Sequence, residues 1–216
     1  MKPPSEVAAK PEDAESAPWF YRKRYLVFGL MYGFAFFAGY LITGVAGVAP
    51  VPAYRALGYP MPLASLAVAL AVGGLALRVW ASSYLTSEVV LSNDTTQTEL
   101  RVSGPYRFTR NPLYLGNILQ AVGIGLVTPW PVLVLTVAGS IAFNFALISV
   151  EEPFLSARQG AAYARYTELV PRLVPFPGKS APSAGQRPSL ADGLRAELTI
   201  GLPAVIIFAA IALTSR

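Results

Sequence analysis

Apolar runs of bilayer-spanning length recur along this chain and restrict its fold more than any other feature. A transmembrane helix needs about 20 residues, because a rise of about 1.5 Å per residue must cross about 30 Å of hydrocarbon. Five segments approach that length: residues 25–45, 62–82, 112–128, 131–150 and 197–214. The chain is 54% hydrophobic and 13% charged, which is too apolar for a soluble domain of 216 residues. We therefore expect an all-α, polytopic integral membrane protein with five transmembrane helices.

Basic residues gather in the loops on one side of these spans. Fifteen of the 17 Lys and Arg residues lie there, and only Arg55 and Arg216 lie opposite. Such a bias places the basic side in the cytoplasm. We expect an inner or cytoplasmic-type membrane, a cytoplasmic N-terminus and a C-terminus on the other side. Because the bias explains the net charge of +5, no nucleic-acid partner is expected.

The chain contains no Cys and no His. Their absence excludes disulfides, thiolate nucleophiles, Cys/His metal sites and an imidazole general base, so we expect no metal. Small residues at 45–50 resemble a cleavage site, but the basic region before them lies too deep in the chain, so we expect no cleaved signal peptide. The sequence does not predict an oligomeric state.

Composition divides the chain into five segments. We expect a disordered tail at 1–18, two spans and a polar cytoplasmic loop at 19–99, and a core at 100–177. A flexible linker at 178–195 and a last span at 196–216 follow. Within the core, 128–131 reads as the tight turn of a helical hairpin and 154–169 as an interfacial helix. In the second span, Gly73 and Gly74 predict close helix packing, and Arg78 is expected to reach lipid headgroups.

A polar, cationic segment runs from 104 into the apolar helix predicted at 112. Asn111 followed by Pro112 is an ordinary helix start, and this explanation covers those two residues alone. The alternative is an anion site, because a helix N-terminus beside Arg107 and Arg110 favours negative charge. Further along, Tyr114, Asn117 and Gln120 recur every three residues and place polar atoms on one face at membrane depth. Asn144 in the next span is a candidate partner.

Two acids, Glu151 and Glu152, precede Pro153 at the predicted end of the fourth span. At a helix C-terminus a carboxylate is unfavourable by up to about 1 kcal/mol, which points to a functional role. The alternative is that Pro153 begins a new helix with both acids at its favourable N-terminal end. Together with the segment at 104–116, the acids predict a site on the cytoplasmic face that is shared by helices three and four.

These motifs resemble the isoprenylcysteine carboxyl methyltransferase / phospholipid methyltransferase superfamily. The resemblance rests on Ser103-Gly-Pro-Tyr-Arg, on Arg110-Asn-Pro-Leu-Tyr-Leu-Gly116, on Glu151-Glu152 and on Val170-Pro-Arg-Leu-Val-Pro-Phe176. It implies an integral-membrane enzyme that uses S-adenosylmethionine, held in a cytoplasmic-side pocket, to methylate a lipophilic small molecule. It further implies that catalysis involves Glu151, Glu152 and Arg110. The implied cofactor contacts, besides the two acids, are Leu100, Tyr106, Arg107, Asn111, Pro112, Leu113, Tyr114 and Gly116. The implied substrate-lining residues are Asn117, Gln120, Asn144 and Leu147.

The chain departs from the superfamily pattern in three places. Asn111 stands where a histidine is usual, Leu147 stands where the isoprenylcysteine branch has an arginine, and the span at 197–214 lies beyond the shared core. Leu147 argues against a prenylcysteine-like substrate. Two other functions stay open: a membrane reductase that uses NADPH, since sterol reductases resemble the same core, and a non-catalytic membrane scaffold.

Overall fold

The computed structural model describes residues 18–45, 61–85 and 100–198, and every regular element in those ranges is helical. The elements are α2 (Trp19–Arg22), α3 (Arg24–Val45), α5 (Met61–Ser82), the 3-10 turn η1 (Gly104–Arg107), α7 (Pro112–Gly125), α8 (Trp130–Gln159), α9 (Ala161–Leu169) and α10 (Leu190–Leu198). The predicted all-helical class is confirmed for this part of the chain.

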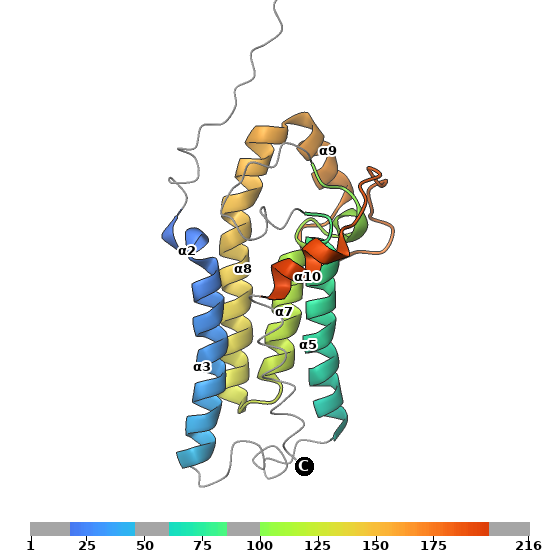
Figure 1. Cartoon of the computed structure of the whole chain (residues 1–216). Helices are drawn as coiled ribbons and strands as arrows, with labels where there is room; N and C mark the ends of the chain where they lie inside the picture. Colours follow the sequence, from blue (N-terminus) through green and yellow to red (C-terminus); the bar gives the residue numbers. More distant parts are fainter. Residues whose placement is uncertain (1–17, 46–60, 86–99, 199–216) are drawn as a thin grey trace, which may run out of the picture.

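Four long helices run side by side in the order α3, α8, α7, α5 (Figure 1). The α7–α8 hairpin turns at 126–129, as predicted, where the Thr128 amide donates to the Gly125 carbonyl at 2.9 Å. α5 and α7 pack most closely, because Gly74 and Gly116 face each other. A Cβ on Gly74 would lie 2.7 Å from the Gly116 carbonyl oxygen. The packing predicted for Gly74 is therefore present, whereas a Cβ on Gly73 would meet nothing within 4 Å.

Within the described ranges, two helices are long and apolar enough to cross a membrane, through the windows Ser65–Ser82 and Trp130–Gln159. α3 contains a shorter apolar stretch at Arg24–Gly39. α7 has 14 residues, and at a rise of about 1.5 Å per residue it reaches only about 21 Å. Large apolar side chains project outward from α3 and α8, which suits contact with lipid: Leu26, Leu30, Phe34, Phe37, Val134, Leu135, Ile141 and Phe145.

α8 does not end at the acids, which corrects two expectations. It continues through Pro153 to Gln159, so Glu151 and Glu152 lie inside a helix and not at either terminus. Neither the unfavourable C-terminal position nor a new helix starting at Pro153 applies. The break predicted at 150–153 falls instead at Gly160, whose φ of 53° favours glycine, and the helix predicted at 154–169 is divided between α8 and α9. A proline removes one helical hydrogen bond, and α8 nevertheless continues for six residues beyond it.

The segment expected to be a flexible linker is held against the loop before α7. The Ala181 amide donates to the Arg107 carbonyl at 3.0 Å, and Gln186 donates from its side chain to the Leu100 carbonyl at 3.1 Å. The chain then forms α10, which packs on α5. Most of the fifth span predicted at 197–214 lies outside the described residues, as do residues 1–17 of the tail predicted at 1–18 and residues 86–99 of the predicted cytoplasmic loop.

Arg78 is buried against α10, whereas its sequence position had suggested a side chain that extends toward lipid headgroups. It is 5% exposed and forms an ion pair with Glu197 of α10, with 2.7 Å between Nε and Oε2. The prediction failed because it considered the second span without a partner for the guanidinium. Glu197 lies 119 residues away in the sequence.

Candidate active site

The two polar clusters singled out in the sequence meet between α7 and α8. Tyr114, in the first turn of α7, donates its hydroxyl to Glu151 Oε2 at 2.5 Å. Glu152, the next residue of α8, lies 3.2 Å from the Arg110 guanidinium and accepts from the Asn111 amide at the same distance. The acids and the start of α7 therefore lie on one side of the molecule and share direct contacts.

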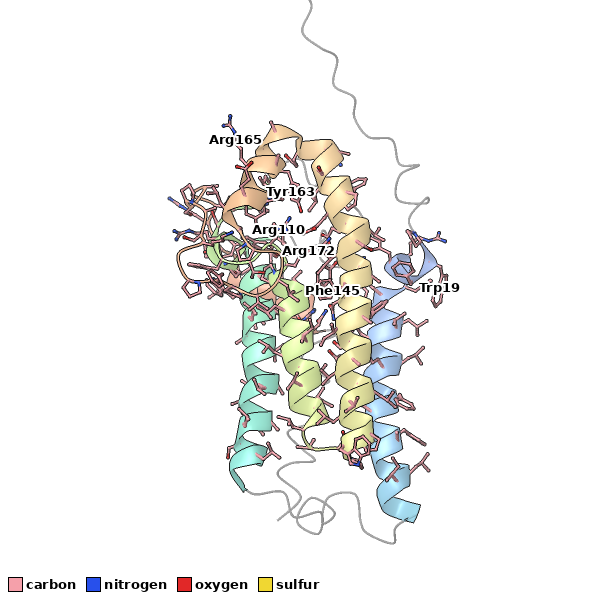
Figure 2. All side chains as sticks on the ribbon, turned by 180° about the vertical axis from the view of Figure 1, so that it is seen from behind. Trp19, Arg110, Phe145, Tyr163, Arg165 and Arg172 are labelled. Carbon is pink, nitrogen blue, oxygen red and sulfur yellow. The ribbon has the colours of Figure 1, made fainter. Side chains whose placement is uncertain are left out.

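Glu152 has partners on both carboxylate oxygens. Oε1 forms an ion pair with Arg110 and accepts a hydrogen bond from Asn111, and Oε2 accepts from Arg172 Nε at 2.8 Å. Figure 2 shows Arg110 and Arg172 together beside α8, below α9. Two guanidiniums therefore face the carboxylate of Glu152, whose side chain is only 12% exposed. We interpret Glu152 as the structural centre of the cluster.

Glu151 is different, because only Oε2 has a hydrogen-bond partner among the described residues. It has a phenol on one side and Glu152 on the other. The free Oε1 can accept a hydrogen bond from a cation or a hydroxyl group. Of the two acids, Glu151 is therefore the one that retains capacity to bind a ligand.

Asn111 occupies the N-cap position of α7 but makes no side-chain capping hydrogen bond. Its amide instead donates to the Arg172 carbonyl at 2.8 Å and to Glu152. The Arg110 backbone amide likewise donates to the Pro171 carbonyl at 3.0 Å. The helix start predicted at Asn111-Pro112 is confirmed, but the side chain joins the loop after α9 to α8 instead of capping α7.

Aromatic side chains surround the acids. Tyr106 of η1 is buried, and its carbonyl accepts from the Tyr166 hydroxyl at 2.7 Å. Burial raises the pKa of the Tyr106 hydroxyl well above its ordinary value, and the nearby charge of Glu151 raises it further. Tyr21 of α2 is also buried, and its pKa rises for the same two reasons. Both phenols therefore stay neutral and can act as hydrogen-bond donors next to Glu151.

Several residues expected to contact a cofactor do not contact the two acids. Arg107 is turned away from the acids, since its Nε donates to the Ala181 carbonyl at 2.9 Å. Leu100 packs on the cluster formed by Tyr163, Tyr166, Val170 and Ala181. Leu113 packs with Tyr106 against α5 and α10, and Gly116 faces Gly74 and Arg78. Only Arg110, Asn111 and Tyr114 among the predicted residues of this segment contact the acids directly.

The predicted substrate-lining residues are buried in the helix interface. Asn117 donates to Asn144 Oδ1 at 2.9 Å, so the predicted partnership is present. Leu147 is 0% exposed and packs with Tyr21 and Phe28. Gln120 is buried, and its Nε2 has no hydrogen-bond partner within the described ranges. These contacts do not test a role in substrate binding.

Sequence reasoning missed Arg172, Tyr21 and Arg24. Arg172 lies in the segment Val170-Pro-Arg-Leu that carried part of the resemblance, so its position was a usable signal. Arg24 was counted only as a topology marker, yet its guanidinium stacks on the rings of Tyr21 and Tyr25, at 5.1 and 4.8 Å from their centroids. Arg24 and Glu151 interact electrostatically, but no local sequence pattern indicates that the start of α3 lies near Glu151.

The chemistry of these residues fits S-adenosylmethionine, which carries a sulfonium, an ammonium and a carboxylate. Glu151 Oε1 is an acceptor with no partner among the described residues, and Arg110 Nε is a buried donor that also lacks one. One site for a cation and one for an anion thus lie in the same cluster. Because protein atoms cover Arg110 Nε, a ligand carboxylate would reach it only after a side-chain movement.

Comparison with known proteins finds one family model that matches part of the chain. Residues 63–161 match the family model described as phospholipid methyltransferase, a range that contains η1, α7, α8 with both acids, and most of α5. The resemblance to the isoprenylcysteine carboxyl methyltransferase / phospholipid methyltransferase superfamily is therefore confirmed over this range. The elements outside this range are α2, α3, most of α9, and α10.

Two curated relatives are bacterial proteins named for metal resistance. The chain is 34% identical over 124 residues to the cobalt-zinc-cadmium resistance protein CzcN of Cupriavidus metallidurans, across 56% of this chain and 53% of that protein. It is 28% identical over 98 residues to the nickel-cobalt-cadmium resistance protein NccN of Alcaligenes xylosoxydans xylosoxydans, across 45% of this chain and 43% of that protein. The matches thus span about half the length of these relatives. No solved structure matches the chain significantly.

Proposed function

We propose that this protein is an integral-membrane methyltransferase that uses S-adenosylmethionine as the methyl donor and a small lipophilic molecule as the acceptor. The contact of Tyr114 and Asn111 at the start of α7 with Glu151 and Glu152 of α8, inside the matched range, carries the proposal. The proposal also includes five spans, a cytoplasmic N-terminus and a cofactor site on the cytoplasmic side. The distribution of Lys and Arg supports this topology.

Within this proposal the residues around the acids have separate tasks. Bound S-adenosylmethionine supplies an electrophilic methyl group on a positively charged sulfur. Glu151 binds the ammonium or the ribose hydroxyls through Oε1, and Tyr114 fixes the orientation of its carboxylate. Arg110 binds the carboxylate of the donor, and Glu152 with Asn111 holds Arg110 and the 170–172 loop in place. Alignment of the reacting atoms at about 3–3.5 Å supplies much of the rate enhancement in such displacements.

The acceptor enters sideways from the bilayer, since the outward faces of α3 and α8 are apolar. A carboxylate acceptor needs no general base, which suits a chain that lacks histidine. An amine acceptor transfers its proton to water or to Glu151. The arginine expected to hold the carboxylate of a prenylcysteine is replaced by the buried Leu147, so we favour a different lipophilic acceptor.

The names of the two relatives refer to metal resistance, which suggests a biological setting for the proposed activity. The described residues contain no group of three or more His, Cys, Asp or Glu side chains that could hold a metal ion, and the sequence has no His or Cys. If this chain acts in metal resistance, we propose that it modifies a membrane constituent instead of binding the metal.

Two measurements test the proposed activity. The purified protein, given membrane lipids and S-adenosylmethionine with a radioactive methyl group, should transfer label to an extractable lipophilic product. Mass spectrometry of small molecules that copurify with the protein should find the donor or its demethylated product. Retention of NADPH without S-adenosylmethionine would select the reductase alternative, and absence of any ligand and any transfer would select the scaffold.

A further inference from the structure

A second polar network crosses the helices next to the candidate site. Arg78 of α5 and Glu197 of α10 are 5% and 1% exposed. The guanidinium donates to both carboxylate oxygens, from Nε to Oε2 at 2.7 Å and from Nη2 to Oε1 at 2.9 Å. The Ser82 hydroxyl also donates to Oε1, at 3.2 Å. Both oxygens of Glu197 are therefore occupied, and α10 is fixed to α5.

The remaining arm of the guanidinium sets the orientation of Asn117 on α7. Arg78 Nη1 donates to Asn117 Oδ1. Because a guanidinium has donors only, Asn117 must turn its oxygen toward α5 and its Nδ2 toward α8. That Nδ2 donates to Asn144 Oδ1 at 2.9 Å, and Asn144 in turn donates to the Ser140 carbonyl at 2.7 Å. The hydrogen bonds run in one direction, from α5 through α7 to α8.

Two side chains within the helical residues of α7 make hydrogen bonds to α8 among the described residues. One is Tyr114 with Glu151 at the candidate site, and the other is Asn117 with Asn144. Tyr114 and Asn117 are three residues apart and share a face of α7. On α8 the fully buried Leu147 lies between Asn144 and Glu151 in the sequence. The contact at Asn117 therefore fixes the rotation of the short α7 helix, and with it the direction in which Tyr114 points.

We propose that Arg78 and Glu197 are positioning residues for the methyltransferase site, acting through Asn117 on the contact between Tyr114 and Glu151. A buried ion pair is weak support for stability, because apolar residues of similar volume are often as good. The hydrogen bond from Arg78 orients the side chain of Asn117, which an apolar pair could not do. This inference rests on the proposed function. It makes α10, which lies outside the matched range, part of the catalytic unit.

The test uses variants that separate stability from positioning. Arg78→Met combined with Glu197→Leu removes the pair without leaving a lone buried charge, so the protein should unfold at a temperature near that of the wild type. Arg78→Lys keeps the charge balance, but its compact ammonium lacks the planar fork that holds Glu197 and Asn117 together. Arg195→Met combined with Glu168→Leu changes the same residue types at exposed positions and is the control.

Two readouts are taken on each variant that folds. A fluorinated tyrosine placed at position 114 reports its contact with Glu151 by fluorine NMR, and calorimetry measures binding of S-adenosylhomocysteine. We expect the double variant and Arg78→Lys to move the fluorine resonance toward that of Glu151→Gln and to weaken binding by about fivefold or more. The control should change neither.

A resonance and an affinity equal to the wild type in either variant would overturn the positioning role. If the double variant does not fold, Arg78→Lys decides by the same two readouts. If wild-type protein fails to bind S-adenosylhomocysteine, the proposed function fails, while the fluorine shift still decides whether Arg78 sets the environment of Tyr114.

Discussion

At the scale of single residues, the two adjacent acids have unequal surroundings. Glu152 has three polar partners on its two oxygens, whereas Glu151 has one hydrogen-bond donor and one free oxygen among the described residues. The sequence does not predict different roles for the two acids, because nothing in Glu151-Glu152-Pro153 distinguishes them. Their different roles follow from residues that are distant in the sequence, chiefly Arg172 and Tyr114.

We predict that Glu152→Gln destabilises the fold by about 1–3 kcal/mol, because Arg110 and Arg172 then face an uncharged amide in a mostly buried place. Thermal unfolding in detergent measures the change. Glu168→Gln on the exposed side of α9 is the control, with an expected change within about 0.5 kcal/mol. Equal stability of Glu152→Gln and wild type would remove Glu152 from the centre of the cluster.

At the scale of elements, apolar length was sufficient to predict α3, α5, α7 and the first part of α8, which were expected at 25–45, 62–82, 112–128 and 131–150. It failed at Pro153, because local propensity favours a helix end there, whereas α8 continues to Gln159. The meeting of the acids with the start of α7 was predictable, since a hairpin with a tight turn brings these two ends together. The residues contributed by α2, α10 and the 170–172 loop were not, because no pairing rule links them to the hairpin.

The close approach of α5 and α7 predicts a contrast between two neighbouring glycines. In Gly74→Ala the new methyl group would lie 2.7 Å from the Gly116 carbonyl oxygen and 2.8 Å from Gln120 Cγ, so the helices must separate, at a cost of about 1–3 kcal/mol. Gly73→Ala meets nothing within 4 Å and should leave stability equal or slightly higher. Thermal unfolding of both variants measures the contrast, and similar losses in the two would argue against this helix contact.

At the scale of the whole molecule, neutral tyrosines tie the loops outside the spans to the helices. Tyr21, Tyr106, Tyr163 and Tyr166 are buried, and burial raises the pKa of each hydroxyl. The pKa of Tyr163 rises to about 12, with the charge of Glu152 adding to the effect of burial. The ordered structure of the site therefore depends on tyrosine hydroxyls that stay protonated.

Alkaline pH should accordingly lower the free energy of unfolding. A tyrosine whose pKa is raised above its unfolded value of about 10 contributes stability that is complete below pH of about 10 and is lost as the pH rises through the folded value. For Tyr163 that window runs from about 10 to about 12. Tyr163→Phe should flatten the fall in unfolding temperature across this window, and an unchanged slope would contradict the burial of a neutral phenol there.

Calorimetric titration of S-adenosylhomocysteine into the protein in detergent tests the central claim most directly, namely that the start of α7 and the acids of α8 form one cofactor site. We predict that wild-type protein binds, and that Glu151→Gln and Asn111→Ala each weaken binding by about tenfold, equivalent to about 1.4 kcal/mol. Wild-type protein that does not bind, or binding that neither substitution alters, would contradict the claim.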